Sequence, residues 1–346
     1  MITAHGFAAP SARGQFKPFE FERRPMTADD ILIDIHYCGI SHSDIHTVRD
    51  EWGGAVYPLV PGHEILGKVQ HVGARVRGFK AGDVVGVGCF VSSCGKCPAC
   101  KAGDEQFCTK AVFTYGAQEP ETGRPTRGGY SDCIVVNQNY VLKIPGNQPL
   151  ERVAPLLCAG ITTYAPLKAA NVRRGTRVGV VGLGGLGHVA VKIAKAMGAE
   201  VTVFSTSEKK KRDALKLGAR HFIVTKKPKA FDKIAGSLDF IIDTVSAQHD
   251  LSPYLNSLRR DGEMTLVGAP EKPVPVGAFA LIMGRRKLGG SLIGGIRQTQ
   301  EMLNFCARHK VLADVEVIAP SKINIAYDRT VAGDVHYRFV IDLKSR

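Results

Sequence analysis

The sequence is poor in aromatic residues, which make up 7% of its 346 residues and include a single tryptophan. Although the formal net charge is +14, no stretch interleaves basic with aromatic residues in the way of nucleic-acid-binding surfaces. Most lysines and arginines are scattered among apolar and acidic residues, as on a solvated surface. We therefore expect no nucleic-acid partner. A local group of basic residues is enough to bind a small anionic ligand.

A long apolar run is also missing. The most apolar stretch near the middle is interrupted by glycines, Lys192 and Lys195, and it falls short of the roughly 18 residues that cross a bilayer. The first residues lack the basic segment and apolar core of a secretory signal. We therefore predict a cytoplasmic protein without a membrane partner. The composition also excludes disordered and fibrous chains.

Glycine and proline, by contrast, are spread along the whole chain, with 38 and 18 residues. The length is enough for about two domains. Up to about residue 150, short β-type runs alternate with Gly, Pro and Asp, which predicts a compact β-rich domain. Examples of these runs are 31–35, 67–69, 83–87 and 134–136.

After Gly175 the pattern changes to an apolar strand, a glycine turn and an amphipathic helix, repeated. Strands are predicted at 178–181, 201–204, 222–224, 240–243, 264–267 and 288–293. Apolar residues between Leu186 and Met197 recur at helical spacing. Because parallel neighbours need a crossover between them, this rhythm predicts a doubly wound parallel sheet of the α/β class. A final strand is expected at 337–343.

Four of the nine cysteines follow the spacing C-x2-C-x2-C-x7-C; they are Cys94, Cys97, Cys100 and Cys108. Four thiolates so close in sequence can enclose one tetrahedral Zn²⁺, with Gly and Pro forming the tight turns. A disulfide pair, which a cytoplasmic chain disfavours, and an iron–sulfur cluster are the alternatives. Because the protein supplies all four ligands, the predicted zinc is structural and has no position for a substrate.

The segment 182–187 matches the pattern G-x-G-x-x-G, directly between an apolar strand and the amphipathic helix. Gly182 allows a sharp turn, Gly184 lets a pyrophosphate approach the backbone, and Gly187 lets the helix pack on the strand. We therefore predict that this turn, including Gly185 and Leu186, binds the phosphates of a dinucleotide.

The next strand does not end on the acidic residue that NAD-binding proteins use for the ribose hydroxyls. It ends on Ser205, Thr206 and Ser207, and a lysine run follows Glu208. Hydroxyl and ammonium groups suit the additional phosphate of NADP(H), so we predict that cofactor, bound by the three hydroxyl residues and Lys210. The alternative is a solvated lysine run at the start of a helix.

Three further segments complete a family pattern: YCGISHSDIH at 37–46, GHE at 62–64 and PLLCAGIT at 155–162. With the cysteine cluster, the glycine turn and VHYRFVID at 335–342, the chain resembles the zinc-dependent medium-chain alcohol dehydrogenases. The resemblance covers nearly the whole chain. It is strongest to the cinnamyl alcohol dehydrogenase branch, which includes bacterial aldehyde reductases.

This resemblance implies a GroES-like catalytic domain formed by 1–153 and 293–346, with a structural zinc lobe near 89–110. It also implies a Rossmann NADP-binding domain at 154–292, a cleft at the domain junction and a homodimer. Thr162 is expected to contact the cofactor. Trp52 is a candidate for lining a pocket that accepts aromatic substrates.

The resemblance further implies a catalytic zinc, whose ligands would be Ser41, His63, Glu64 and Cys158. The first of these departs from the family pattern, which has a cysteine there, and a neutral hydroxyl is a much poorer zinc ligand than a thiolate. Three interpretations stay open. Zinc could be held by the other three residues with Ser41 or water in the fourth place, Cys38 could reach the metal, or the site could be metal-free with altered chemistry.

The family's proton relay corresponds to Ser43 and His46, with Glu51 at its outer end, since hydroxyl and imidazole groups both donate and accept protons. We predict an NADP(H)-dependent oxidoreductase that interconverts aldehydes and primary alcohols by zinc-assisted hydride transfer, with a broad or aromatic and allylic range of aldehydes. Alternatives are a zinc-independent NADPH reductase of enones or quinones, and a catalytically impaired NADP-binding protein. Only Ser41 favours either alternative.

Overall fold

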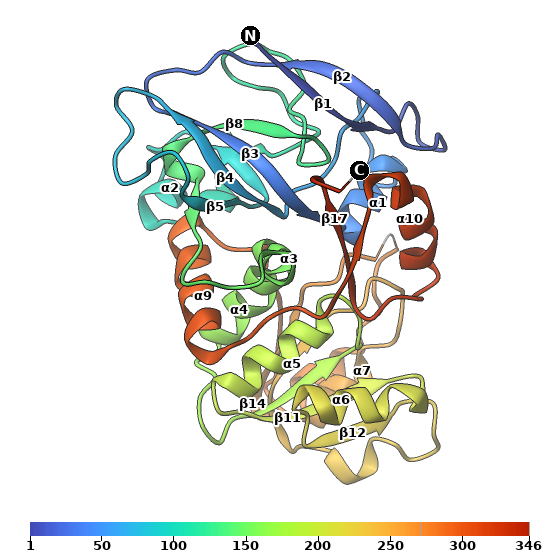
Figure 1. The fold of residues 1–346 in the computed structure, drawn as a ribbon. Helices are drawn as coiled ribbons and strands as arrows, with labels where there is room; N and C mark the ends of the chain where they lie inside the picture. Colours follow the sequence, from blue (N-terminus) through green and yellow to red (C-terminus); the bar gives the residue numbers. More distant parts are fainter. Residues whose placement is uncertain (271, 346) are drawn as a thin grey trace. The chain divides into compact units, whose positions relative to one another are not determined.

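The computed structural model describes residues 1–270 and 272–345, which form two compact units. Unit 1 comprises Met1–Cys158, Gly294–Arg308 and Leu312–Arg346. Unit 2 comprises Ala159–Ile293 and His309–Val311. Figure 1 shows the elements of both units along the chain. None of the helices in the described part of the chain combines the length and hydropathy needed to cross a bilayer.

Unit 1 is built on a seven-stranded sheet with β3 at its centre. The path runs β16 (Val315–Ile318), β17 (Arg338–Asp342), β3 (Asp30–Gly39), β4 (Ile65–Val72), β5 (Val84–Val87) and β9 (Leu142–Lys143), and β8 (Cys133–Asn137) also pairs with β3. The isoleucines of β3, such as Ile31 and Ile33, are fully buried in the core. Because β17 pairs antiparallel with β3, the end of the chain lies beside its first part.

Shorter elements complete unit 1. The remaining strands are β1 (Ile2–Ala8), β2 (Lys17–Arg23), β6 (Phe90–Ser92) and β7 (Val112–Phe113). The α-helices are α1 (His42–Val48), α2 (Pro98–Ala102), α3 (Leu150–Val153), α9 (Ile296–His309) and α10 (Ile323–Val331). The 3-10 turns are η1 (Glu105–Phe107), η2 (Gln138–Tyr140), η3 (Ala154–Leu157) and η6 (Pro320–Lys322). The hairpin of β1 and β2 forms a separate sheet, as does the pair of β6 and β7.

Unit 2 contains the predicted parallel sheet, with strand order β12-β11-β10-β13-β14-β15. The strands are β10 (Arg177–Val181), β11 (Glu200–Ser205), β12 (His221–Val224), β13 (Leu238–Asp243), β14 (Leu258–Leu266) and β15 (Lys287–Gly290). All neighbours are parallel. This order confirms the doubly wound topology. From β10 the chain first adds strands on one side and then continues on the other side with β13, and ligands of such sheets bind at this switch point.

Two strand boundaries of unit 2 differ from the prediction by three residues or more. β14 begins at Leu258, whereas the prediction began it at residue 264. The prediction missed the first half of this strand because residues 259–261 are polar and exposed, and such residues look like a loop in the sequence. β15 ends at Gly290 rather than at residue 293, and the positive φ of 34° at Ile293 lies outside the strand region.

The helices of unit 2 are α4 (Ala159–Ala169), α5 (Gly187–Ala196), α6 (Lys211–Leu217), α7 (Ser252–Ser257) and α8 (Ala278–Ile282). The 3-10 turns are η4 (Glu208–Lys210) and η5 (Asp232–Ile234). In Figure 1, α5 and α6 lie beside β11 and β12. The helix α5 contacts β10 and β11, and α6 contacts β12. The predicted helix after the glycine turn is therefore α5.

Candidate active site

The centre of the site is His63, a buried residue in the turn before β4. Its Nδ1 lies 3.1 Å from Oδ1 of Asp44, which is completely buried on α1. The other oxygen of Asp44 accepts a 2.8 Å hydrogen bond from the backbone N–H of Ser41. A carboxylate on one ring nitrogen fixes the orientation of the imidazole and leaves Nε2 available to a metal. Asp44 was not among the predicted site residues, although it lies in the segment that carries the resemblance.

Two cysteines lie beside His63. Each of the residues His63, Cys89 and Cys158 offers one ligand atom, and these three atoms lie within 4.8 Å of one another. Cys158 follows η3 and is buried, and Cys89 is half-buried between β5 and β6. The structure thus brings together the predicted ligands His63 and Cys158. Cys89 is an additional thiol that no motif in the sequence had indicated.

Ser41 occupies the edge of this cluster. It is the N-cap of α1, where its Oγ accepts a hydrogen bond from the backbone N–H of Ser43, and the same oxygen lies 4.0 Å from Sγ of Cys158. Cys38 is elsewhere. Its buried thiol lies 2.8 and 2.9 Å from the places that β-carbons on Gly62 and Gly129 would take, so it is packed against these two glycines.

Glu64 is directed to a different partner. Its Oε1 forms an ion pair with the guanidinium of Arg338 at the start of β17, and both side chains are buried. Its Oε2 has no hydrogen-bond partner among the described residues. Burial raises the pKa of Glu64 to about 8, although Arg338 opposes that shift. Arg338 was not predicted as a site residue. A buried arginine in an apolar strand is the signal that could have indicated it.

Asp44 and His63 each shift the pKa of the other towards its charged form. Burial would raise the pKa of Asp44, but the charge and hydrogen bond of His63 outweigh it and lower that pKa. Burial would lower the pKa of His63, but Asp44 and Cys158 outweigh it and raise that pKa well above 6.5. Asp44 and Cys158 therefore both favour a positive charge at this position.

The donors of this cluster fit a zinc ion. Imidazole and thiolate groups are the usual zinc ligands, and a catalytic site keeps one position open for water or substrate. The unpartnered Oε2 of Glu64 is a further buried acceptor near the same residues. We therefore regard His63 and Cys158 as able to hold the predicted metal.

The predicted relay residues lie on and after α1. His46 follows Ser43 by three residues, so the two share a helix face. The Nδ1 of His46 is hydrogen-bonded to Oε2 of Glu51, and its buried Nε2 has no partner among the described residues. Trp52 stacks on His46 with ring centroids 4.9 Å apart. The imidazole is thus bonded to a carboxylate on one side and leaves its other nitrogen available.

The predicted structural zinc lobe forms a second group of possible metal ligands in unit 1. The four Sγ atoms of Cys94, Cys97, Cys100 and Cys108 lie within 4.8 Å of one another. Backbone N–H groups point at the sulfurs, for example Cys97 N to Cys94 Sγ at 3.3 Å. The backbone N–H groups of Lys96 and Cys97 lower the pKa of Cys94 to about 6. Four converging sulfurs with backbone donors fit one tetrahedral zinc ion.

The predicted cofactor residues lie in unit 2 at the ends of β10 and β11. Gly182 has a positive φ of 87°, and a β-carbon on Gly187 would collide with the Gly182 carbonyl. Among the described residues, no heavy atom lies within 4 Å of the place that a β-carbon on Gly184 would take. Nζ of Lys210 donates a 2.8 Å hydrogen bond to the carbonyl of Leu183, so this ammonium group lies beside the glycine turn.

The remaining predicted cofactor contacts are Ser205, Thr206, Ser207 and Thr162. Ser205 ends β11, and its Oγ accepts a 3.2 Å hydrogen bond from the backbone N–H of Ser207. Thr162 is buried in α4. The turn therefore offers backbone amides, hydroxyl groups and one ammonium group to an anionic ligand, which fits a phosphorylated dinucleotide.

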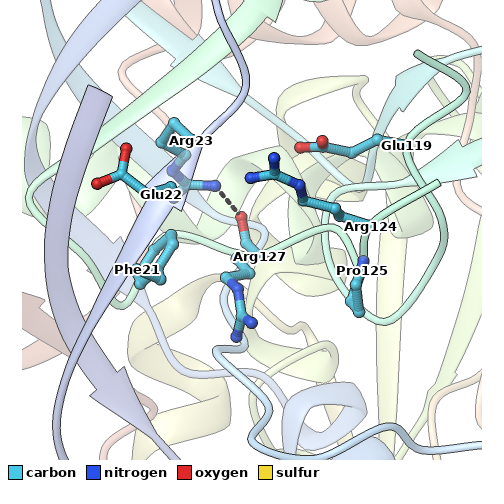
Figure 2. Close-up of a pocket in the computed structure, with 7 residues that line it drawn as sticks. All are labelled: Phe21, Glu22, Arg23, Glu119, Arg124, Pro125 and Arg127. Carbon is cyan, nitrogen blue, oxygen red and sulfur yellow. Dashed lines mark hydrogen bonds between the residues drawn. The ribbon is translucent and has the colours of Figure 1, made fainter. Parts of the chain in front are cut away.

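A separate pocket of about 290 Å³ lies in unit 1 between β2 and the segment 119–127. Figure 2 shows its three arginines, with Arg23 bonded to the carbonyl of Arg127. Arg23 also donates to the carbonyls of Gly128 and Cys133. None of the residues lining this pocket belongs to the predicted site, and Arg23 already has structural partners. We therefore assign no catalytic role to it.

The fold and the two groups of possible metal ligands are those of a zinc-binding dehydrogenase, and comparison with known proteins agrees. Residues 27–146 match the alcohol dehydrogenase GroES-like domain and residues 185–308 match the zinc-binding dehydrogenase family. The chain belongs to the zinc-binding alcohol dehydrogenases, which confirms the resemblance inferred from the sequence, the GroES-like and Rossmann fold class, and the prediction of an oxidoreductase.

Its relatives are similar over their whole length. The chain is 55% identical to NADP-dependent alcohol dehydrogenase C 1 of Mycolicibacterium smegmatis, over 100% of this chain and 99% of the relative. A cinnamyl alcohol dehydrogenase structure from Sorghum bicolor superposes with a TM-score of 0.97 at 46% identity, covering 100% and 99%. The enzyme of the same type from Helicobacter pylori, complexed with NADP(H), gives 0.94 at 48% identity, covering 99% of each chain. The predicted cofactors, NADP(H) and zinc, agree with these relatives and with the family.

Proposed function

We propose that this chain is an NADP(H)-dependent aldehyde reductase that also oxidises the corresponding primary alcohols, with zinc assistance at the cluster around His63. The observation that carries the proposal is the convergence of His63 and Cys158 in one buried cluster oriented by Asp44. The NADP-dependent relatives and the position of Lys210 beside the glycine turn support the choice of cofactor.

The bound groups would supply two kinds of chemistry, which are Lewis-acid polarisation of a carbonyl oxygen by zinc and hydride from NADPH. The residues of the chain have the other tasks. Asp44 holds the His63 ring in place, and Ser43 and His46 move a proton towards the substrate oxygen while Glu51 orients His46. Trp52, stacked on His46, contributes an aromatic surface for the substrate.

The wider assembly belongs to the same proposal. We infer a homodimer formed through unit 2, because β15 ends the sheet and α8 next to it exposes Phe279 and Ile282. We also infer a cytoplasmic location. All nine cysteines lie among the described residues and are free, as thiols are in a reducing compartment.

The proposal is tested by following NADPH oxidation with a panel of aliphatic, benzaldehyde-like and cinnamaldehyde-like substrates. We expect turnover that a zinc chelator abolishes and that added zinc restores, with NADPH preferred to NADH. Activity confined to enones or quinones and insensitive to the chelator would contradict the proposal, as would NADPH binding without turnover of any aldehyde.

A further inference from the structure

The site lacks a thiol at the position of Ser41, and the structure contains an unassigned thiol beside the same two ligands. We propose that Cys89 is the second thiolate ligand of the catalytic metal in this chain. The inference rests on the proposed zinc-assisted function, because it concerns the same metal. Its ground is the convergence of Cys89, His63 and Cys158, whose ligand atoms all lie within 4.8 Å of one another.

The backbone around Cys89 is held in place. The backbone N–H of Thr114 donates to the Cys89 carbonyl at 3.1 Å, and the Thr114 hydroxyl donates to the Gly88 carbonyl at 2.6 Å. Sγ of Cys89 lies 3.9 Å from the carbonyl of Leu157, the residue before Cys158. Cys89 therefore faces the segment that carries the other thiol, from a backbone that two hydrogen bonds restrain.

The other candidates for the second sulfur position are engaged elsewhere. Ser41 uses its hydroxyl as the N-cap of α1, and a neutral hydroxyl binds zinc poorly. Glu64 offers oxygen rather than sulfur, and one of its two oxygens is paired with Arg338. The thiol of Cys38 is packed against Gly62 and Gly129. Cys89 is thus the soft donor that the structure places in reach of the metal.

The resulting ligand set is chemically complete. Two thiolates and one imidazole, with a fourth position open, are the set that catalytic zinc uses in alcohol dehydrogenases. In this chain one of the two sulfur ligands would be Cys89 in the β5–β6 connection, instead of a cysteine in the turn before α1. Although residue 41 is a serine, the metal would then have two sulfur ligands, Cys89 and Cys158.

The test measures metal binding directly. Zinc content by elemental analysis should fall from two ions per chain in the wild type to one in Cys89→Ser, while the lobe at Cys94 keeps its ion. Replacing the catalytic ion by Co²⁺ should give a thiolate charge-transfer absorption that is weaker in Cys89→Ser than in the wild type. Circular dichroism and the thermal midpoint report whether the variant is folded.

Two further variants make the result specific. Cys306→Ala, which removes another free thiol from α9, should retain two zinc ions and the full cobalt absorption. Ser41→Cys in the Cys89→Ser background should restore the second ion. A folded Cys89→Ser protein with two zinc ions and an unchanged cobalt spectrum would overturn the assignment, and so would one zinc ion in the wild type.

Failure of this inference is distinguishable from failure of the proposed function. If the wild type reduces aldehydes and Cys89→Ser keeps the metal and its spectrum, only the assignment of Cys89 is wrong. If the wild type binds two zinc ions and Cys89→Ser loses one, but no aldehyde is reduced, the ligand assignment stands and the proposed activity is wrong.

Discussion

Asp44 connects three parts of the candidate active site. Its carboxylate is completely buried and accepts hydrogen bonds from the backbone N–H groups of Ser41 and Gly62, at 2.8 and 3.2 Å. The hydroxyl of Tyr130 donates to it at 3.3 Å, and the His63 ring lies at 3.1 Å. A buried carboxylate is tolerated only with such a full set of partners. One side chain thus connects the cap of α1, the turn before β4 and the candidate metal ligand.

Lys210 provides the residue-scale prediction. If its ammonium group binds the additional phosphate of NADPH, Lys210→Ala removes a charge-assisted hydrogen bond of about 1.5–3 kcal/mol. Steady-state kinetics should then show a KM for NADPH raised at least about tenfold, with the KM for NADH unchanged. Lys209→Ala, at an exposed neighbouring position, is the control and should change neither value. Equal losses with both cofactors would mean that Lys210 only supports the turn through Leu183.

At the scale of elements, a buried ion pair fastens the connection between β2 and β3. Asp30, at the start of β3, accepts two hydrogen bonds from the Arg24 guanidinium, at 2.6 and 2.8 Å. It also accepts one from the backbone N–H of Thr27 at 2.6 Å. Burial would raise the pKa of Asp30, but these hydrogen bonds outweigh it and lower the pKa below 3.8.

We therefore expect Asp30→Asn to lower the free energy of unfolding by about 3 kcal/mol at neutral pH, because it leaves the buried Arg24 charge without its partner. The folded-state pKa of Asp30 is below the unfolded-state value, so its contribution is present above pH 3.8 and is lost as the pH falls through the folded-state pKa. Urea unfolding should show a wild-type advantage that shrinks in acid. Asp29→Asn, which breaks the exposed pair with Arg75, is the control and should leave the midpoint nearly unchanged.

At the scale of the whole molecule, three strongly exposed apolar side chains lie on and next to α8. Phe279, Ile282 and Met283 are 75%, 66% and 77% exposed. Neighbouring β15 is the last strand of its sheet and offers an edge for pairing. Exposed apolar side chains close in sequence to an edge strand favour an interface between copies of a chain.

Charging this surface should separate the copies. We expect the wild type to sediment as a dimer and Ile282→Asp as a monomer in analytical ultracentrifugation, because a carboxylate cannot be buried unpaired in an apolar interface. Val331→Asp charges an exposed apolar position of α10 in unit 1 and should leave the dimer intact. A wild type that sediments as a monomer, or a dimer that survives Ile282→Asp, would contradict this interface.

The features that could be predicted from the sequence are those whose partners lie close together in the chain. The glycine turn and α5 occupy adjacent residues, and their spacing alone indicates a strand, a turn and a helix. The four lobe cysteines lie within 15 residues of one another, so their spacing indicates a common metal before any fold is known. The position of His63 as a metal ligand, by contrast, came from the family resemblance.

The tertiary structure alone decided which distant side chains complete the site. Glu64 and Arg338 are 274 positions apart, and they meet because β17 and β4 both pair with β3. Cys89 reaches Cys158 from the end of β5, a contact that no local spacing encodes. Local patterns specify turns and periodic faces, whereas contacts between distant residues depend on sheet pairing and the packing of the core. For this reason the sequence by itself determined the zinc lobe and the dinucleotide turn, and the fold determined the partners of His63.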